Sequence, residues 1–233
     1  MFATTQQMRR DQIDQGLRVF LISVYNKMTA ALALTGATAW FAAPYIGSLV
    51  QLSGWWALFF AFLPLAFVVP LTLMSSISLS VAHLLVWAYA VTVGLSMSTI
   101  FLTYTLGSIA QVFFISSSVF AAASIYGYTT TKDLTSLSSF LFMGVIGLIV
   151  ASVVNLVLGS PLISWLISAA AVLVFTILTS YDSQKLRDEY LSRGEVYGFD
   201  SPERSSIHGA LTLYLDFINI FIHLLQLLGQ KKD

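Results

Sequence analysis

Long apolar runs separated by short polar stretches make up most of the sequence from residue 20 onward. Apolar runs of about 20 residues are the pattern of helices that cross a lipid bilayer. They predict transmembrane helices over residues 20–43, 55–75, 81–105, 109–127, 136–158, 162–186 and 207–229, with a tight turn at Gly159-Ser160-Pro161. Residues 1–19 form a polar N-terminal segment and residues 190–206 a charged linker. We therefore expect residues 1–233 to form a single transmembrane domain of the all-α class.

The charged residues indicate which helix ends face the cytoplasm. Between Met28 and Tyr181 the only formal charges are Lys132 and Asp133. A cytoplasmic N-terminus places these basic residues on the inner side: Arg9, Arg10, Arg18, Lys27, Lys132, Lys185, Arg187, Arg193 and Arg204. Such an excess follows the positive-inside rule. Lys231 and Lys232 agree with that rule only if the last helix is re-entrant, but the 19 residues of LTLYLDFINIFIHLLQLLG are long enough to favour a full span.

Composition narrows the class of function. The chain of 233 residues is 57% hydrophobic and 9% charged, whereas soluble domains carry about 25% charged residues. A formal net charge of +0 gives no basic surface for nucleic acid. The absence of cysteine and the spacing of the three histidines argue against a zinc site.

Two other membrane-protein functions are excluded by missing residues. A retinal protein needs a lysine in its last helix, and a rhomboid-like serine protease needs a GxSG motif that GLSMS (94–98) lacks. We therefore expect no enzymatic activity and no bound cofactor.

The last predicted helix carries polar residues on one side. Thr212, Asp216, Asn219, His223 and Gln226 alternate at intervals of four and three, which places them on one face of an α-helix. A polar stripe in a membrane helix is expected to face the helix bundle. For Thr212, Asn219 and Gln226 the simplest role is interhelical hydrogen bonding, at about 0.6 kcal/mol per contact. Histidine side chains in general titrate near neutral pH, so His223 is a candidate for tuning the site, together with Asn219.

Asp216 needs a stronger explanation, because an ionised Asp at a helix centre costs about 2.5–3.5 kcal/mol. No buried Lys or Arg partner is available from the second to sixth predicted helices, whose apolar parts contain no basic residue. The remaining candidate is Asp182, in TSYDSQKL near the cytoplasmic end of the preceding helix. Two carboxylates in a poorly solvated site do not both ionise easily, so they are expected to titrate as a unit.

Such a pair of carboxyl groups could bind a proton or a cation. It can hold a shared proton near neutral pH, and loss of that proton leaves negative charge that attracts a cation. Calcium prefers about six to eight oxygen ligands, so Asp182 and Asp216, completed by carbonyls and water, would form a weak calcium site. Weak binding suits conduction because the ion must also leave.

Three segments resemble one known family. LYLDFIN (213–219), SYDSQKL (180–186) and YGYTTTKDL (126–134) are similar to the Bax inhibitor-1 family (transmembrane Bax inhibitor motif proteins), in its bacterial YccA-type branch. The likeness covers most of the chain. It implies a multi-pass protein of the bacterial inner (plasma) membrane, with a seventh helix surrounded by the other six. It also implies a pH-sensitive calcium leak gated by an aspartate pair, at the positions of Asp182 and Asp216 here.

The chain departs from the family pattern at one place. Some bacterial members carry basic residues where the second helix meets the cytoplasm, whereas this chain has MSSISLSVAH (74–83) there, with only His83. A gate that relies on an arginine at that position is therefore in question, and the pH at which the gate responds is expected to differ.

Three functions stay open on these residues. The first is a passive calcium conduit controlled by protons, and the second is a proton-coupled calcium exchanger. The third is a non-transporting regulator in stress response or membrane proteolysis, with membrane-protein partners, in which the two acids only pack the last helix.

Overall fold

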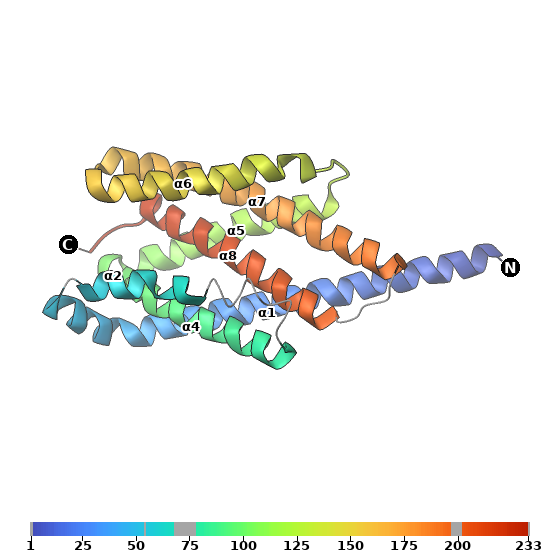
Figure 1. Ribbon diagram of the computed structural model, residues 1–233, viewed down its shortest axis with the longest axis horizontal. Helices are drawn as coiled ribbons and strands as arrows, with labels where there is room; N and C mark the ends of the chain where they lie inside the picture. Colours follow the sequence, from blue (N-terminus) through green and yellow to red (C-terminus); the bar gives the residue numbers. More distant parts are fainter. Residues whose placement is uncertain (1, 54, 68–77, 197–201, 233) are drawn as a thin grey trace. The chain divides into compact units, whose positions relative to one another are not determined.

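The computed structural model describes residues 2–53, 55–67, 78–196 and 202–232, and these residues are almost entirely helical. In chain order the elements are α1 (Phe2–Leu52), α2 (Trp55–Phe62), the 3-10 helix η1 (Leu63–Phe67), α4 (Leu79–Thr103), α5 (Leu106–Thr129), the 3-10 helix η3 (Thr135–Leu137), α6 (Ser138–Leu158), α7 (Pro161–Val196) and α8 (Pro202–Leu228) (Figure 1). No β-strand occurs in the described ranges, where Tyr104 and Lys231 form one isolated bridge. The predicted all-α class is confirmed.

Six helices in the described residues are long and apolar enough to cross a membrane. They lie within α1, α4, α5, η3 with α6, α7, and α8. Of the second predicted helix, 55–75, the structure forms α2 and η1, and residues 68–75 lie outside the described residues. The chain is therefore a multi-pass membrane protein with six helices of spanning length in its described part.

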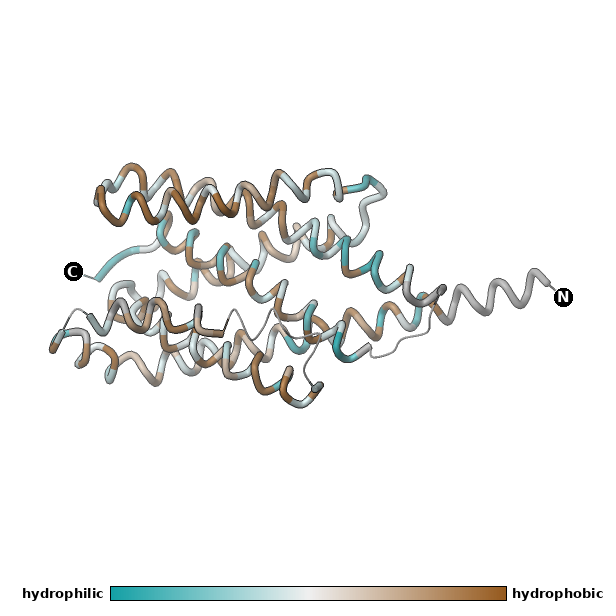
Figure 2. The backbone as a smooth tube through the Cα atoms, viewed as in Figure 1, coloured by the Kyte–Doolittle hydropathy of each residue, from teal (hydrophilic) through white to brown (hydrophobic). Residues whose placement is uncertain are grey.

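Helix α6 shows the membrane character most clearly. Its span is 6% buried, and large apolar side chains such as Phe140, Ile149 and Val157 are exposed along it. Figure 2 shows α6 hydrophobic over most of its length, with polar residues gathered in the connection that precedes it. A soluble protein rarely exposes so much contiguous apolar surface, and a lipid bilayer supplies the apolar surroundings that this surface needs.

Several helices extend beyond the limits of their apolar runs. Helix α1 covers Phe2–Leu52 instead of 20–43, and α7 and α8 take up both ends of the predicted linker 190–206, of which 197–201 lie outside the described residues. An apolar run marks only the part of a helix that lies in lipid, whereas polar residues such as Glu, Lys and Arg also favour helix. Pro44 lies inside α1 and does not end it, and membrane helices tolerate such prolines.

The predicted turn between α6 and α7 is confirmed. Gly159 has a left-handed φ of 61°, and its N–H donates to Asn155 O at 2.8 Å, which caps α6. Pro161 then starts α7 at the position where its missing N–H costs nothing. Helices α6 and α7 consequently run side by side (Figure 1).

The chain divides into two compact units. The first contains Met1–Leu21, Gly107–Asp200 and Leu215–Gly229, and the second contains Ile22–Leu106, Ser201–Tyr214 and Gln230–Asp233. Helices α1 and α8 contribute a segment to each unit. In the first unit the rings of Phe113 and Phe120, on α5, meet the ring of Phe217, on α8, edge to face. This aromatic packing holds α8 against α5.

Candidate functional site

Asp182 and Asp216 lie on α7 and α8 and belong to the first unit. Both side chains are buried, with relative exposures of 8% and 2%. Their carboxyl groups interact directly with each other. The structure therefore brings together two acids that lie 34 positions apart in the sequence.

One carboxyl oxygen at this site has no donor. Oδ2 of Asp216 is buried and has no hydrogen-bond partner among the described residues. The Thr179 hydroxyl lies beside Asp216 and 2.8 Å from Phe175 O, and its single proton can serve only one of these two acceptors. A carboxylate only accepts hydrogen bonds, so Asp182 can supply a donor only by carrying a proton itself.

The nearest charges lie on the same helix as Asp182. Lys185 and Glu189, about one and two turns further along α7, both act electrostatically on this carboxyl group. Lys185 is exposed and forms no ion pair with either acid within the described residues. It therefore acts on the site from the surface of α7 and is not a buried basic partner of the pair.

Close packing against α5 fixes the α7 backbone beside the acids. Gly127 of α5 lies against the Ser180 carbonyl, with no space for a Cβ atom. Ser180 Oγ donates to Ala123 O at 2.9 Å, and the hydroxyls of Ser124 and Ser183 are 2.9 Å apart. Short polar side chains and a glycine allow two membrane helices to approach closely. Asp182 is thus positioned by a rigid contact within one turn of it.

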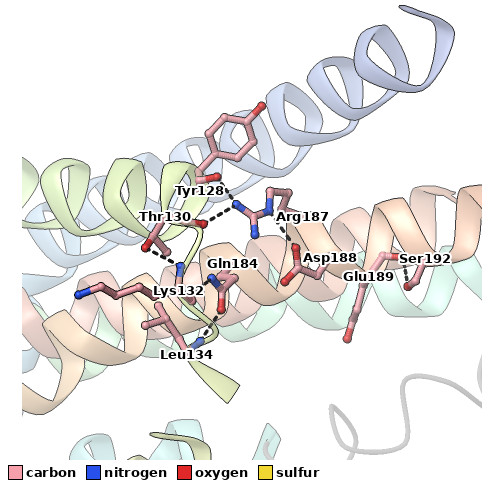
Figure 3. A network of polar contacts seen from close by, with 9 residues as sticks. All are labelled: Tyr128, Thr130, Lys132, Leu134, Gln184, Arg187, Asp188, Glu189 and Ser192. Carbon is pink, nitrogen blue, oxygen red and sulfur yellow. Dashed lines mark hydrogen bonds and ion pairs between the residues drawn. The ribbon is translucent and has the colours of Figure 1, made fainter. Parts of the chain in front are cut away.

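A second set of contacts ties the α5–α6 connection to α7, just beyond Asp182 (Figure 3). The buried Gln184 accepts from Leu134 N at 2.8 Å and donates to Lys132 O at 2.7 Å. Arg187 Nη1 donates to Tyr128 O and Thr130 O at 2.6 and 3.1 Å. The segment YGYTTTKDL, noted in the sequence for its family resemblance, is therefore held by backbone acceptors and one backbone donor.

Sequence reasoning missed Thr179, Gln184 and Arg187 as parts of this region. Polar residues inside or next to a membrane helix indicate a contact with another part of the protein. Their spacing along the helix places these three residues within two turns of Asp182. Their partners, however, are mainly backbone carbonyls, which no residue type reveals.

The rest of the predicted polar stripe on α8 is less buried than Asp216. Asn219 Nδ2 donates to Leu215 O of its own helix at 2.8 Å. His223 Nδ1 and Gln226 Oε1 are 3.3 Å apart, and Ser168 Oγ of α7 donates to the same Gln226 oxygen at 2.6 Å. Asn219 and His223 are half-buried and Gln226 is exposed. The interhelical hydrogen bond predicted for Gln226 is confirmed by the contact with Ser168, whereas Thr212 and Asn219 donate to carbonyl groups of α8 itself.

His83 belongs to the second unit, whereas the aspartate pair belongs to the first. It belongs to α4, where its Nε2 is 3.1 Å from Oε1 of the exposed Glu203. Residues 74–77 of MSSISLSVAH lie outside the described residues. Within the described ranges, no group of three or more His, Cys, Asp or Glu side chains could hold a metal ion.

Comparisons with known proteins agree on one family. The model of the family described as "Inhibitor of apoptosis-promoting Bax1" matches residues 17–233. The chain is 38% identical over 232 residues to the inner membrane protein YbhL of Escherichia coli, covering 96% of this chain and 98% of YbhL. It is 40% identical over 232 residues to an uncharacterized protein of Rickettsia prowazekii, covering 98% of this chain and 97% of that protein. The match covers nearly the full length of these relatives, and the chain belongs to the Bax inhibitor-1 family.

Proposed function

We propose that the chain is a pH-sensitive leak for calcium ions, in which Asp182 and Asp216 bind the ion and gate its passage. One observation carries the proposal: two buried carboxyl groups interact directly, and one oxygen of Asp216 has no donor among the described residues. A buried carboxylate without a partner is costly, whereas a shared proton or a cation removes that cost. Packing alone would be achieved more cheaply by Asn or Ser at these positions.

The protonation state of the pair sets the charge that a cation meets. With one shared proton each carboxyl group has a partner, and the pair carries a single negative charge. With no proton the pair carries two negative charges, which attract a divalent cation, and Lys185 and Glu189 modulate this charge from α7. Oxygen ligands suit calcium, but two carboxylates hold it weakly enough to release it. We therefore expect flux to rise with pH.

We further infer the placement of the chain in the membrane. The name of YbhL, inner membrane protein, supports the same location for this chain. The positive-inside pattern supports a cytoplasmic N-terminus. The span of α8 is 56% buried, more than the other five candidate spans, which supports the central position that the family resemblance implies for the last helix.

The direct test measures calcium entry into liposomes that contain the purified protein and a calcium indicator. We expect entry to increase between about pH 6 and pH 8, where a shared carboxyl proton would be lost. Asp216→Asn and Asp182→Asn should each abolish this increase, because the amide cannot take up or release the proton. The matched control is Asp14→Asn, the same atomic change at an exposed position of α1.

The outcomes separate the possible functions. Absence of calcium entry at every pH would contradict the leak and favour a non-transporting regulator. If calcium entry stays pH-dependent in both Asn variants, the two acids do not form the gate, although the protein still conducts calcium. Calcium entry that requires opposite movement of protons would replace the leak by an exchanger, which a pH indicator inside the liposomes would reveal.

A further inference from the structure

A cavity of about 590 Å³ lies in the second unit, remote in sequence from the two acids. Its walls come from the C-terminal part of α1, the end of α4, the start of α5 and the C-terminal tail, through residues that include Trp40, Phe41, Tyr45, Phe101, Leu102 and Lys232. Cavities of about 300–1,000 Å³ are the usual size for small-molecule sites, and they are mostly apolar with a few polar groups. This cavity has that composition.

The cavity lies where candidate membrane spans end. The span in α4 ends at Thr103, the span in α5 begins at Leu106, and the candidate span of α1 ends at Leu49. Trp40 and Tyr45 are 50% and 75% exposed, and these two residue types concentrate where hydrocarbon meets the polar headgroups. A ligand at this depth therefore meets both the apolar acyl region and the polar headgroup region.

The C-terminal tail brings one cation to the cavity and holds it there. Lys232 N donates to Thr103 O at 2.9 Å, and Thr105 N donates to Gln230 O at 3.0 Å. Lys232 Nζ donates to Phe101 O at 2.8 Å. An ammonium group carries three donors, so Nζ retains two for a ligand after the Phe101 contact. No carboxylate is among the residues that line the cavity, so its formal charge is positive.

We propose that this cavity binds a phospholipid with an anionic headgroup, its acyl chain against the aromatic walls and its phosphate against Lys232 Nζ. Charge complementarity selects this occupant. An apolar ligand would leave the positive charge of the ammonium group without a counter-charge, and a soluble anion would leave Trp40, Phe41 and Tyr45 uncovered. Lysine binds phosphate as a point charge, and a basic residue near the membrane surface attracts anionic lipid. The site would also account for Lys231-Lys232 on the outer side, where the positive-inside rule does not expect them.

The test is native mass spectrometry of the full chain in detergent, titrated with phosphatidylglycerol. Diacylglycerol with the same acyl chains is the probe without phosphate. Lys232→Gln should weaken phosphatidylglycerol binding about fivefold, because about 1 kcal/mol is lost with the charge. It should leave diacylglycerol binding unchanged. Lys231→Gln removes the same charge from a residue that does not line the cavity, and should change phosphatidylglycerol binding by less than about twofold.

Three results would overturn the proposal. Equal phosphatidylglycerol binding by the wild type and Lys232→Gln would remove the role of Lys232. If both lysine variants weakened phosphatidylglycerol binding equally, the binding would depend on surface charge in general and not on the cavity. Equal binding of phosphatidylglycerol and diacylglycerol by the wild type would remove the role of phosphate. Thermal unfolding of both variants checks the fold, and Gln keeps a donor for Phe101 O.

Discussion

Two buried polar clusters on α8 lie two residues apart in sequence and differ in how their hydrogen bonds are completed. Tyr214, in the second unit, has its hydroxyl 2.8 Å from Thr35 Oγ1, which donates to Ala90 O at 2.9 Å. These two neutral hydroxyl groups form a short series of hydrogen bonds that ends on a backbone carbonyl, so each of them has a partner. Asp216, in the first unit, meets another carboxyl group and lacks a donor for Oδ2 among the described residues.

The difference separates a buried polar group whose hydrogen bonds are complete from one whose hydrogen bonds are incomplete among the described residues. A completed neutral chain stabilises the fold by about 0.5–1.5 kcal/mol per hydrogen bond and has no reason to respond to pH. An acid pair needs something from outside the protein, a proton or a cation, to reach its stable state. Burial alone would not separate Tyr214 from Asp216, since both are almost fully buried.

The largest effect on stability is expected where α7 packs on α5 beside the acid pair. Gly127→Ala places a Cβ atom against the Ser180 carbonyl and should cost about 1–3 kcal/mol of unfolding free energy. Thermal or denaturant unfolding in detergent measures this. Gly147→Ala on α6 is the control, because nothing lies within 4 Å of its added Cβ atom and alanine favours helix. Equal stability of the two variants would show that the close contact is not needed.

A smaller loss of stability is expected at the Tyr214 cluster, where the hydrogen bonds are complete. Tyr214→Phe removes the hydroxyl beside Thr35 and should cost about 1 kcal/mol, while calcium entry into liposomes keeps its pH dependence. Tyr89→Phe should cost less, because the Tyr89 hydroxyl makes no hydrogen bond within the described residues. If Tyr214→Phe abolished the pH dependence, the two clusters could not be assigned separate roles.

The smallest effect is expected at Asp133, a carboxylate whose hydrogen-bond donors are both present in the structure. Asp133, exposed between α5 and η3, accepts from Thr135 Oγ1 and N at 2.6 and 2.8 Å, and these hydrogen bonds lower the pKa of its carboxyl group. A lowered pKa in the folded state adds stability above the unfolded pKa, and that stability is lost as pH falls through the folded value. Thr135→Val should therefore raise the pKa of Asp133 toward 3.8, as followed by carbon NMR. Thr131→Val is the control and should leave it unchanged.

The sequence was sufficient for the features that depend on residue type and periodicity. The all-α class, most of the long apolar helices and the Gly159 turn follow from apolar runs and from the conformational freedom of glycine. Asp182 was singled out as the partner of Asp216 because few other intramembrane charges exist to choose from.

The remaining features depend on distances that a single sequence does not contain. Helix ends outside the lipid have no apolar signal, so the continuation of α7 from residue 186 to Val196 was not predicted. The contacts of Gln184 and Arg187 use backbone atoms of Lys132, Tyr128 and Thr130, which are common to every residue type. The cavity beside Lys232 depends on segments of the chain that are distant in sequence and meet only in the folded protein.

The backbone contact between Gly127 and Ser180 has a consequence for how α7 moves. Sliding of α7 along its axis would bring side chains into the space that only glycine leaves open. Asp182 is half a turn from this contact, and the hydrogen bonds of Gln184 and Arg187 hold α7 on the other side of it. The Asp182 carboxyl group therefore lies between two anchored parts of α7, which limits its displacement along the helix axis.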